Sequence, residues 1–425
     1  MKLGIIGSGG REYAIATKLL EANPKLELHV LPGNAAMSDF AQIHPEISAT
    51  DIPAVLNFCR AEHIDFCVVT PDDPLVLGMV DALEDAGITC FGPRKAGAML
   101  EGSKSFAKEF MLRHGIPTAA YECFEDFDAA LAYARQAAYP LVIKADGLAL
   151  GKGVSIVSDA AEAERTLRNF MLDHKFGNAS ARVVLEEFLS GPEISVLSFC
   201  DGNTIKPLLS SMDHKRVFDG GAGPNTGGMG VIAPNPVFSD EVEREFREKI
   251  MEPTLAGLRS DGIDFRGCLY FGLMNTPSGL KVIEYNARFG DPETQVVLPL
   301  LRGNLLEIFQ AVAAGELETV PVEFEDRAAA CVVMAAAGYP EHPRKGAKIT
   351  YSARVAPYLV FAGVARTAAG ELISAGGRVL NVLGFGQTLE EAVAAAYENV
   401  KEIHFPHRHF RTDIGAQALE IKAGK

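Results

Sequence analysis

The first hundred residues alternate between short apolar segments and longer amphipathic ones, as strands and helices alternate around a parallel sheet. Strands are predicted at residues 3–6, 27–31 and 66–70, and a helix at residues 11–22 follows the first strand. Parallel strands need a crossover connection, usually a helix, so this alternation predicts an N-terminal α/β domain. The chain has 425 residues, which is too long for one hydrophobic core, and two to four domains are expected.

The composition narrows the classes of function. The net charge is −15 and no basic run occurs, so nucleic acid is not an expected partner. Seven scattered cysteines, without metal-ligand or redox spacing, fit free thiols in a reducing cytoplasm. The chain begins with a strand rather than a signal peptide. Its apolar run at residues 328–339 is too short to cross a bilayer, so no membrane association is expected.

A glycine turn, Gly7-Ser-Gly-Gly10, joins the first predicted strand to its helix. A dinucleotide-binding turn would have a third glycine at the position of Glu12, and its second strand would end in an acid rather than in Pro32-Gly-Asn34. The free amides of a helix N-terminus still attract an anion, so we predict that the turn binds one phosphate of a substrate. A turn required only for close packing of strand and helix is the alternative.

The segment 140–158 is predicted as two strands joined by a glycine-rich loop. Lys144 ends the first strand and Lys152 lies in the loop, so ammonium groups and free backbone amides can neutralise a triphosphate. The loop is not of the Walker type, because Asp146 and Gly153 stand where that pattern needs glycine and a hydroxyl residue. We predict a flap over phosphates, with a solvent-exposed hairpin as the alternative.

A further strand is predicted at residues 182–189, where the chain continues into a linker that contains Glu193. The free backbone N–H and C=O groups at the end of such a strand can pair with the edge of an adenine ring. The carboxylate of Glu193 can accept hydrogen bonds from ribose hydroxyls. The sequence therefore indicates a nucleotide between this strand and the flap.

The segment 281–293 combines a strand with a turn rich in charged residues. Residues two apart on a strand share a face, so Glu284 and Asn286 point the same way. Carboxylate and amide oxygens suit Mg²⁺, which completes its shell with phosphate and water. Arg288 and Asp291 follow in a turn where the strand ends. We predict a metal site here; a half-buried strand with solvated Glu and Asn is the alternative.

The glycine-rich run 219–230 has no predicted helix or strand. Loops of this composition bring backbone close to a ligand when they are ordered, and a disordered linker is the alternative. Short polar residues in and before the run favour a binding site: Asp213, Lys215, Arg216, Asn225 and Thr226.

Several motifs together resemble the phosphoribosylamine–glycine ligase family of ATP-grasp enzymes, and the resemblance extends over nearly the whole chain. The most specific are Gly223-Pro-Asn-Thr-Gly-Gly-Met-Gly230 and Asn286-Ala-Arg-Phe-Gly-Asp-Pro-Glu293, with Lys144-Ala-Asp-Gly147 and Leu100-Glu-Gly-Ser-Lys104 in support. The resemblance implies ligation of glycine to 5-phosphoribosylamine in purine biosynthesis. ATP would be consumed, a glycyl phosphate intermediate would form, and the products would be glycinamide ribonucleotide, ADP and phosphate.

The implied fold is a multidomain α/β protein. It has an N-terminal parallel-sheet substrate domain at 1–102, an ATP-grasp core at 103–325 with a mobile lid at about 118–190, and a small C-terminal domain at 326–425. The implied partners are small molecules, without nucleic acid or membrane, and the enzyme would be a cytoplasmic monomer or weak dimer.

The resemblance also assigns residues. Glu284 and Asn286 would hold Mg²⁺ or Mn²⁺, and the catalytic residues would be Arg288, Lys144 and Asp291. The ATP-binding residues would be Lys104, Lys144, Gly151, Lys152, Gly153, Glu186, Phe188, Leu189 and Glu193. The residues that bind glycine and phosphoribosylamine would be Gly9, Gly10, Arg11, Glu12, Asn34, Asp213, Lys215, Asn225, Thr226, Gly227, Gly228 and Arg288.

Some positions depart from the family pattern. Tyr13 replaces a usual histidine, Asp72 and Asp73 replace a usual Glu-Ala pair, and Gly221 replaces a usual acid. The strand at 267–274 also lacks the acid that ATP-grasp relatives carry before the Glu-x-Asn pair. These departures concern substrate affinity and the metal ligands rather than the fold. Three other functions were considered: a carboxylase-type ATP-grasp enzyme, a nucleotide-binding protein without turnover, and a nicotinamide-dependent oxidoreductase.

Overall fold

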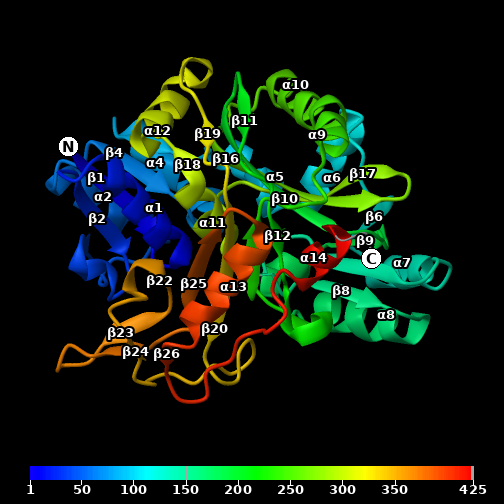
Figure 1. The fold of residues 1–425 in the computed structure, drawn as a ribbon. Helices are drawn as coiled ribbons and strands as arrows, with labels where there is room; N and C mark the ends of the chain where they lie inside the picture. The colour runs from blue at the N-terminus through cyan, green and yellow to red at the C-terminus, as the bar shows by residue number, and fades with distance from the viewer. Residues whose placement is uncertain (150, 423–425) are drawn as a thin grey trace.

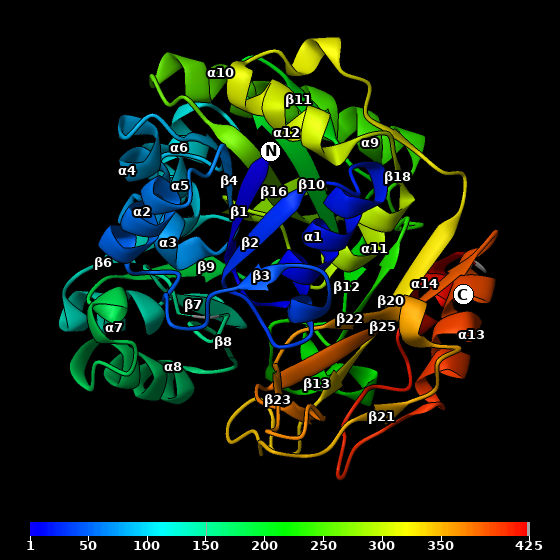
Figure 2. The same cartoon turned by 90° about the vertical axis from the view of Figure 1, so that its left-hand side faces the viewer.

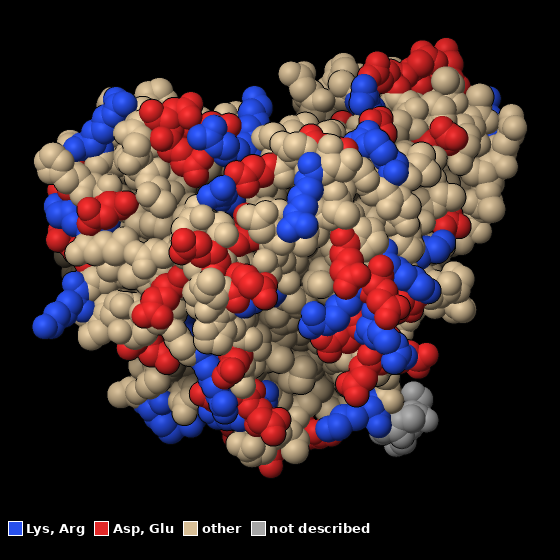
Figure 3. All heavy atoms as spheres, turned by 90° about the horizontal axis from the view of Figure 1, so that it is seen from above, with Lys and Arg blue, Asp and Glu red and all other residues tan. Residues whose placement is uncertain are grey.

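The computed structural model describes residues 1–149 and 151–422. Within this range, helices pack around four sheets of four or five strands, which confirms the α/β class (Figure 1). Figure 2 shows the N-terminal sheet beside the central strands, with the C-terminal sheet below them. None of the helices among these residues is long and apolar enough to cross a membrane. Lysine, arginine and acidic side chains are intermixed over the face drawn in Figure 3.

The N-terminal sheet is wholly parallel, as the alternation of strands and helices predicted. Its strand order is β3-β2-β1-β4-β5. The strands are β1 (Lys2–Gly7), β2 (Glu27–Pro32), β3 (Gln42–Ile43), β4 (Phe66–Val69) and β5 (Thr89–Phe91). The helices of this part are α1 (Gly10–Ala22), α2 (Ile52–Ala61), α3 (Asp72–Leu77) and α4 (Met79–Asp85). The three strands and the helix predicted here are confirmed within two residues at each end.

A second sheet, with the order β6-β9-β7-β8, carries the predicted flap. Its strands are β6 (Tyr121–Phe124), β7 (Leu141–Ala145), β8 (Val154–Val157) and β9 (Val183–Glu187), and two helices, α7 (Phe127–Ala134) and α8 (Ala160–Leu167), pack on it. These elements share a hydrophobic cluster of their own, formed only by residues between 130 and 185. A unit with its own core can change position without exposing the cores of its neighbours.

The central sheet is antiparallel and has the order β11-β10-β16-β17. Its strands are β10 (Glu193–Asp201), β11 (Ile205–Pro207), β16 (Arg266–Thr276) and β17 (Gly279–Asn286). The associated helices are α5 (Lys95–Gly102), α6 (Lys104–Arg113), α9 (Asp240–Phe246) and α10 (Glu252–Ser260). Strands β16 and β17 pair with each other, and Gly272 lies opposite Glu284.

The remaining large sheet combines strands from two parts of the chain, in the order β12-β15-β20-β25-β22. Two strands come from the middle of the chain, β12 (Met212–Asp213) and β15 (Gly230–Ala233), and three from its end, β20 (Ala328–Ala335), β22 (Leu359–Phe361) and β25 (Arg378–Gly386). Helix α13 (Leu389–Val400) covers β20 and β25. The backbone of residues 212–233 is therefore held by the C-terminal part of the chain.

The glycine-rich run 219–230 differs from its prediction, which gave it no strand. Residues Ala222–Asn225 form β14, which pairs with β13 (Arg216–Phe218) in a hairpin. Gly220 and Gly221 turn the chain between them at φ of 68° and 67°, values that glycine adopts without a steric cost. Helix α14 (Ala416–Lys422) follows α13 near the end of the described residues.

Four phenylalanines join the N-terminal sheet to the central sheet directly beneath the turn that follows β17. Phe91 stacks on Phe309 of α12 (Leu305–Ala314) with ring centroids 4.0 Å apart, and Phe199 and Phe289 complete the group at 5.8 to 6.3 Å. All four are at most 1 % exposed. Burial of an aromatic side chain removes roughly 150–250 Å² from water, so this group is a strong fixed point for residues 288–293.

We expect Phe309→Ala to lower the free energy of unfolding by about 3–5 kcal/mol, because it leaves a cavity among three other aromatic rings. Urea unfolding followed by fluorescence or circular dichroism measures the loss. Leu112→Ala is the control, since Leu112 is 71 % exposed and its truncation should cost at most about 0.5 kcal/mol. A loss at Phe309 no larger than that at Leu112 would contradict the role given to this aromatic group.

Candidate active site

A cavity of about 1110 Å³ lies between the flap sheet, the central sheet and the loop after β12. Most of the residues proposed for the site from the sequence line it. They are Lys104, Lys144, Gly151, Gly153, Glu186, Phe188, Leu189, Glu193, Asp213, Lys215, Asn225, Thr226, Gly227, Glu284, Asn286, Arg288 and Asp291. Segments separated by more than 180 residues in the sequence thus meet around one space large enough for a nucleotide and a second small molecule.

Strand β17 presents Glu284 and Asn286 to this cavity, as the alternation of the strand predicted. Tyr285 turns the other way, and its hydroxyl contacts that of Thr254 at 2.8 Å. Within the described residues, the Glu284 carboxylate makes no hydrogen bond or ion pair with another side chain, whereas Asn286 Oδ1 accepts a hydrogen bond from Arg288 at 3.2 Å. The side chains of Glu284 and Asn286 therefore offer hard oxygen ligands to the cavity, and the two carboxylate oxygens of Glu284 are free to bind a cation.

The electrostatics keep Glu284 ionised. Burial raises the pKa of this carboxyl, but the positive charges of Lys215, Lys144, Lys104 and Arg288 outweigh burial and lower the pKa below its ordinary value. No group of three His, Cys, Asp or Glu side chains in the described chain can hold a metal ion. A cation at Glu284 would thus need the Asn286 amide together with oxygens from phosphate or water, which fits the preference of Mg²⁺.

Two lysines reach the cavity from different elements. Ser103 caps α6 by accepting a hydrogen bond from the Phe106 amide at 3.2 Å, which places Lys104 in the first turn of the helix. Lys144 stands near the end of β7 and donates to the backbone carbonyl of Ile283 at 3.3 Å. Burial lowers the pKa of Lys104, and the Glu284 charge opposes that shift. The two ammonium groups and Glu284 thus share one side of the cavity.

Glu186 on β9 is held by two buried lysines. Its Oε2 atom lies 2.9 Å from Lys144 Nζ and 3.1 Å from Lys108 Nζ, while Oε1 is buried and has no hydrogen-bond partner among the residues that the structure describes. Burial lowers the pKa of Lys108 to about 8, and the Glu186 charge opposes that shift. Sequence reasoning missed Lys108. The available signal was its spacing of four from Lys104, which places both on one face of α6.

Arg288 is also fixed by a residue to which the sequence gave no role. Glu101 Oε1 lies 2.8 Å from Arg288 Nη2, and Glu101 Oε2 accepts a hydrogen bond from the Ala287 amide at 2.8 Å. Burial raises the pKa of Glu101 to about 7, against the opposing effect of Arg288. The pair holds the guanidinium at the end of β17, where it can face an anionic group.

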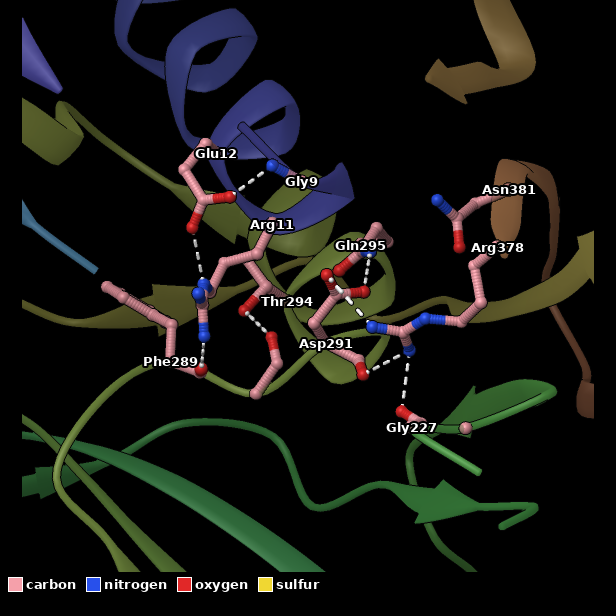
Figure 4. Close-up of polar contacts among 12 residues, drawn as sticks. Gly9, Arg11, Glu12, Gly227, Phe289, Asp291, Thr294, Gln295, Arg378 and Asn381 are labelled. Atoms are coloured by element: carbon pink, nitrogen blue, oxygen red, sulfur yellow. Dashed lines mark hydrogen bonds and ion pairs between the residues drawn. The ribbon is translucent and has the colours of Figure 1, made fainter. Parts of the chain in front are cut away.

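The N-terminal turn lies outside the lining of the cavity, and several of its polar groups form hydrogen bonds within the protein. Glu12 accepts hydrogen bonds from the Gly9 amide at 2.5 Å and from Arg11 at 2.6 Å (Figure 4). It also accepts one from the Thr70 hydroxyl at 2.6 Å. The Asn34 amide nitrogen donates to the carbonyls of Ser8 and Phe361. Substrate binding by Gly9, Gly10, Arg11, Glu12 and Asn34 therefore stays a prediction.

Two other proposed residues also lie away from the lining. Lys152 is exposed and donates to the carbonyl of Pro340 at 3.4 Å, so the tip of the flap reaches the C-terminal part of the chain. Gly228 is buried against Pro292, and a Cβ atom on it would lie 2.5 Å from Pro292 Cδ and 2.8 Å from Asp213 Oδ1. Gly228 thus permits the glycine-rich run to pack directly on the turn after β17.

Comparison with known proteins agrees with this geometry. Sequence models of phosphoribosylglycinamide synthetase match the N domain at residues 1–101, the ATP-grasp (A) domain at 102–294 and the C domain at 329–417. The phosphoribosylamine–glycine ligase of Xanthomonas axonopodis pv. citri is 46 % identical over 99 % of this chain and 98 % of its own length. The chain belongs to this ligase family.

Other relatives and solved structures agree. The phosphoribosylamine–glycine ligase of Caldanaerobacter subterraneus subsp. tengcongensis is 41 % identical over 98 % of this chain and all of its own length. The crystal structure of the Thermotoga maritima ligase has a TM-score of 0.86 at 35 % identity, and covers 97 % of this chain and 100 % of that one. The biotin carboxylase domain of Hydrogenobacter thermophilus 2-oxoglutarate carboxylase shares the fold alone, with a TM-score of 0.76 at 17 % identity over 99 % of this chain and 93 % of that domain.

The positions that depart from the family pattern lie in different surroundings. Tyr13 packs edge-on against Phe40 and Phe361, and burial raises its pKa to about 12. Asp72 and Gly221 line the cavity. Tyr13 therefore acts at the contact between the N-terminal and C-terminal parts, whereas Asp72 and Gly221 border the site itself.

We expect Glu186→Gln to reduce the preference of this ligase for ATP over inosine triphosphate by about tenfold or more. The free Oε1 atom can accept from the 6-amino group of adenine and would repel the 6-oxo group of hypoxanthine. In the variant, Lys108 and Lys144 bind the amide oxygen, so the amide nitrogen turns to the cavity and favours the 6-oxo group. The ratio of kcat/KM for the two nucleotides measures the change.

Glu122→Gln is the matched control, because Glu122 is exposed on the neighbouring strand β6. That variant should keep the wild-type ratio. An unchanged ratio in Glu186→Gln would show that the unpaired oxygen does not contact the base.

Proposed function

We infer that this chain joins glycine to 5-phosphoribosylamine with the hydrolysis of ATP, giving glycinamide ribonucleotide, ADP and phosphate in the cytoplasm. The observation that carries this inference is one cavity in which an unpaired carboxylate, Glu284, lies among Lys104, Lys144, Lys215 and Arg288, in a chain of this ligase family. Such a collection of cations around an oxygen ligand suits a metal-bound triphosphate.

A divalent cation, Mg²⁺ or Mn²⁺, fits the two oxygen ligands that β17 offers. Glu284 and Asn286 would hold it, and when bound it would neutralise the charge of the nucleotide phosphates. The unpaired state and lowered pKa of Glu284 support this assignment. Met274, rather than an acid, lines the cavity from β16, so the rest of the coordination shell would come from phosphate and water.

The lysines and the arginine would carry out the remaining charge stabilisation. Lys104 and Lys144 would bind phosphate oxygens, and the flap residues Gly151 and Gly153 would offer backbone amides. The glycine carboxylate would attack the γ-phosphate to form glycyl phosphate. Arg288, oriented by Glu101, would bind the carboxylate and then the acyl phosphate. Asp291, in the same turn after β17, would be a further catalytic residue.

The amine of phosphoribosylamine would then displace phosphate from glycyl phosphate. Asp213, Lys215, Asn225, Thr226, Gly227 and Gly228 would position glycine and the amine, with Phe188, Leu189 and Glu193 at the nucleoside. Burial raises the pKa of Asp213 and so favours its neutral form, whereas the Glu193 charge raises the pKa of Lys215 and keeps it protonated. Closure of the flap would exclude water from the acyl phosphate.

The first experiment is release of ADP that depends on both glycine and phosphoribosylamine. Release with bicarbonate in place of glycine would instead support a carboxylase-type reaction. Nucleotide binding without ADP release would support a binding protein.

We expect Glu284→Ala to reduce kcat by about a hundredfold or more, because the phosphates would lose their metal ligand, while the fold is retained. Steady-state assays at saturating ATP and Mg²⁺ measure kcat, and circular dichroism reports the fold. Glu241→Ala, an exposed acid in the first turn of α9, is the control and should keep full activity. Normal turnover in Glu284→Ala would remove the metal assignment.

A further inference from the structure

The backbone of a single residue in the glycine-rich run, Gly227, is held on both sides by two residues from the C-terminal part of the chain. Arg378 Nη1, at the start of β25, donates to the Gly227 carbonyl at 2.5 Å, and the Gly227 amide donates to the Tyr339 hydroxyl at 3.2 Å. Both polar groups of Gly227 are therefore satisfied by side chains far away in the sequence. Sequence reasoning gave neither Arg378 nor Tyr339 a role.

Arg378 simultaneously holds the turn after β17. The same Nη1 atom donates to the Asp291 carbonyl at 2.6 Å, and Nη2 lies 3.3 Å from Asp291 Oδ2 (Figure 4). Gln295 donates to the other carboxylate oxygen of Asp291 at 2.7 Å. Burial raises the pKa of Asp291, but Arg378 and Arg11 outweigh burial and lower it. Asp291 is therefore a charged partner of Arg378, and the guanidinium fork joins two backbone carbonyls and one carboxylate.

The glycines of this run are required by the close packing. A Cβ atom on Gly227 would lie 3.1 Å from Arg378 Cζ, so a side chain there would press on the guanidinium. Gly228 has a φ of +111° and packs on Pro292 and Asp213. A run with this much glycine has many conformations when it is free, so fixed contacts are needed to give it one. Arg378 supplies one of those contacts, at Gly227.

The partners of Arg378 place this interaction beside the reaction space. Gly227 and Asp291 both line the cavity. Thr226, which precedes Gly227, donates hydrogen bonds from its amide and its hydroxyl to the Lys215 carbonyl, at 2.8 Å each. Arg378 itself is not among the lining residues. It acts on the cavity through the backbone that it holds.

We propose that Arg378, with Tyr339, is a positioning residue that fixes the Gly227 peptide against the Asp291 turn and so shapes the end of the cavity that binds the amino-acid substrate. This rests on the proposed function, in which the 213–228 segment binds glycine and phosphoribosylamine. The nucleotide end of the cavity is formed by other elements, so the effect should fall on the substrates that the 213–228 segment binds and should spare ATP.

The test compares full-length wild type with Arg378→Gln, Arg378→Lys and Tyr339→Phe. Arg378→Gln should raise KM for glycine at least tenfold and leave KM for ATP within twofold. Arg378→Lys keeps the charge beside Asp291 but not the fork, so its KM for glycine should fall between those of wild type and Arg378→Gln. In the double variant Arg378→Gln/Tyr339→Phe, the effects should be less than multiplicative, because both side chains hold the backbone of the same residue, Gly227.

Arg366→Gln is the matched control for loss of a contact between distant parts of the chain. Arg366 pairs with Asp39 at 2.6 Å and donates to the Ala35 carbonyl at 3.2 Å, away from the cavity. This variant should lower the melting temperature as Arg378→Gln does while leaving KM for glycine unchanged. If Arg378→Gln lowers only the melting temperature and keeps both KM values within twofold of wild type, the positioning role is wrong.

Hydrogen–deuterium exchange of residues 222–230 provides a readout that does not depend on the reaction. Exchange should be at least tenfold faster in Arg378→Gln than in wild type, and unchanged in Arg366→Gln. If wild type shows no glycine-dependent ADP release, the proposed function fails. Exchange then decides the positioning role separately, and equal exchange in wild type and Arg378→Gln would overturn it.

Discussion

The site depends on a cluster of positive charges. Three of them pair with an acid other than Glu284, whereas Lys104 makes no ion pair within the described residues. Lys144 pairs with Glu186, Arg288 with Glu101 and Lys215 with Glu193, all at 2.8 to 2.9 Å. Two like charges about 4 Å apart near a protein surface repel by about 4 kcal/mol, so these cations would not stay together unpaired. The three pairs reduce that repulsion, and Glu284 makes no ion pair with the described residues, so its carboxylate can accept a cation.

The elements that sequence reasoning predicted well are those encoded by neighbouring residues. Strand β17 follows from the alternation of side chains along it, and the parallel N-terminal sheet from the alternation of strand and helix segments. The charged motif at 286–293 predicts the turn after β17. The hairpin β13–β14 was missed because its glycines and proline carry little strand propensity. The chain adopts it there because Gly220 and Gly221 reverse its direction and the backbone groups pair across the turn.

The residues of the site that were missed act through partners distant in the sequence. Glu101 lies 187 residues before Arg288, and Arg378 lies 151 residues after Gly227. A charged residue without a nearby partner is usually a solvated surface group, so a single sequence gives no reason to single these out. Lys108 is different, because its spacing from Lys104 on α6 was visible. The sequence could not show that Glu186 of β9 lies next to Lys108 of α6 in the folded chain.

The parts of the chain contribute different kinds of interaction to the cavity. The flap sheet and α6 contribute lysines, β17 contributes oxygen ligands, and the C-terminal part contributes Arg378 and Tyr339, which hold backbone. The flap has a core of its own, whereas both ends of the 212–233 segment, β12 and β15, are paired into the C-terminal sheet. Under the proposed function, charge at the phosphates would change with the position of the flap while the ends of the glycine-rich run keep their place. Nucleotide binding and recognition of the second substrate would then be separated physically within one cavity.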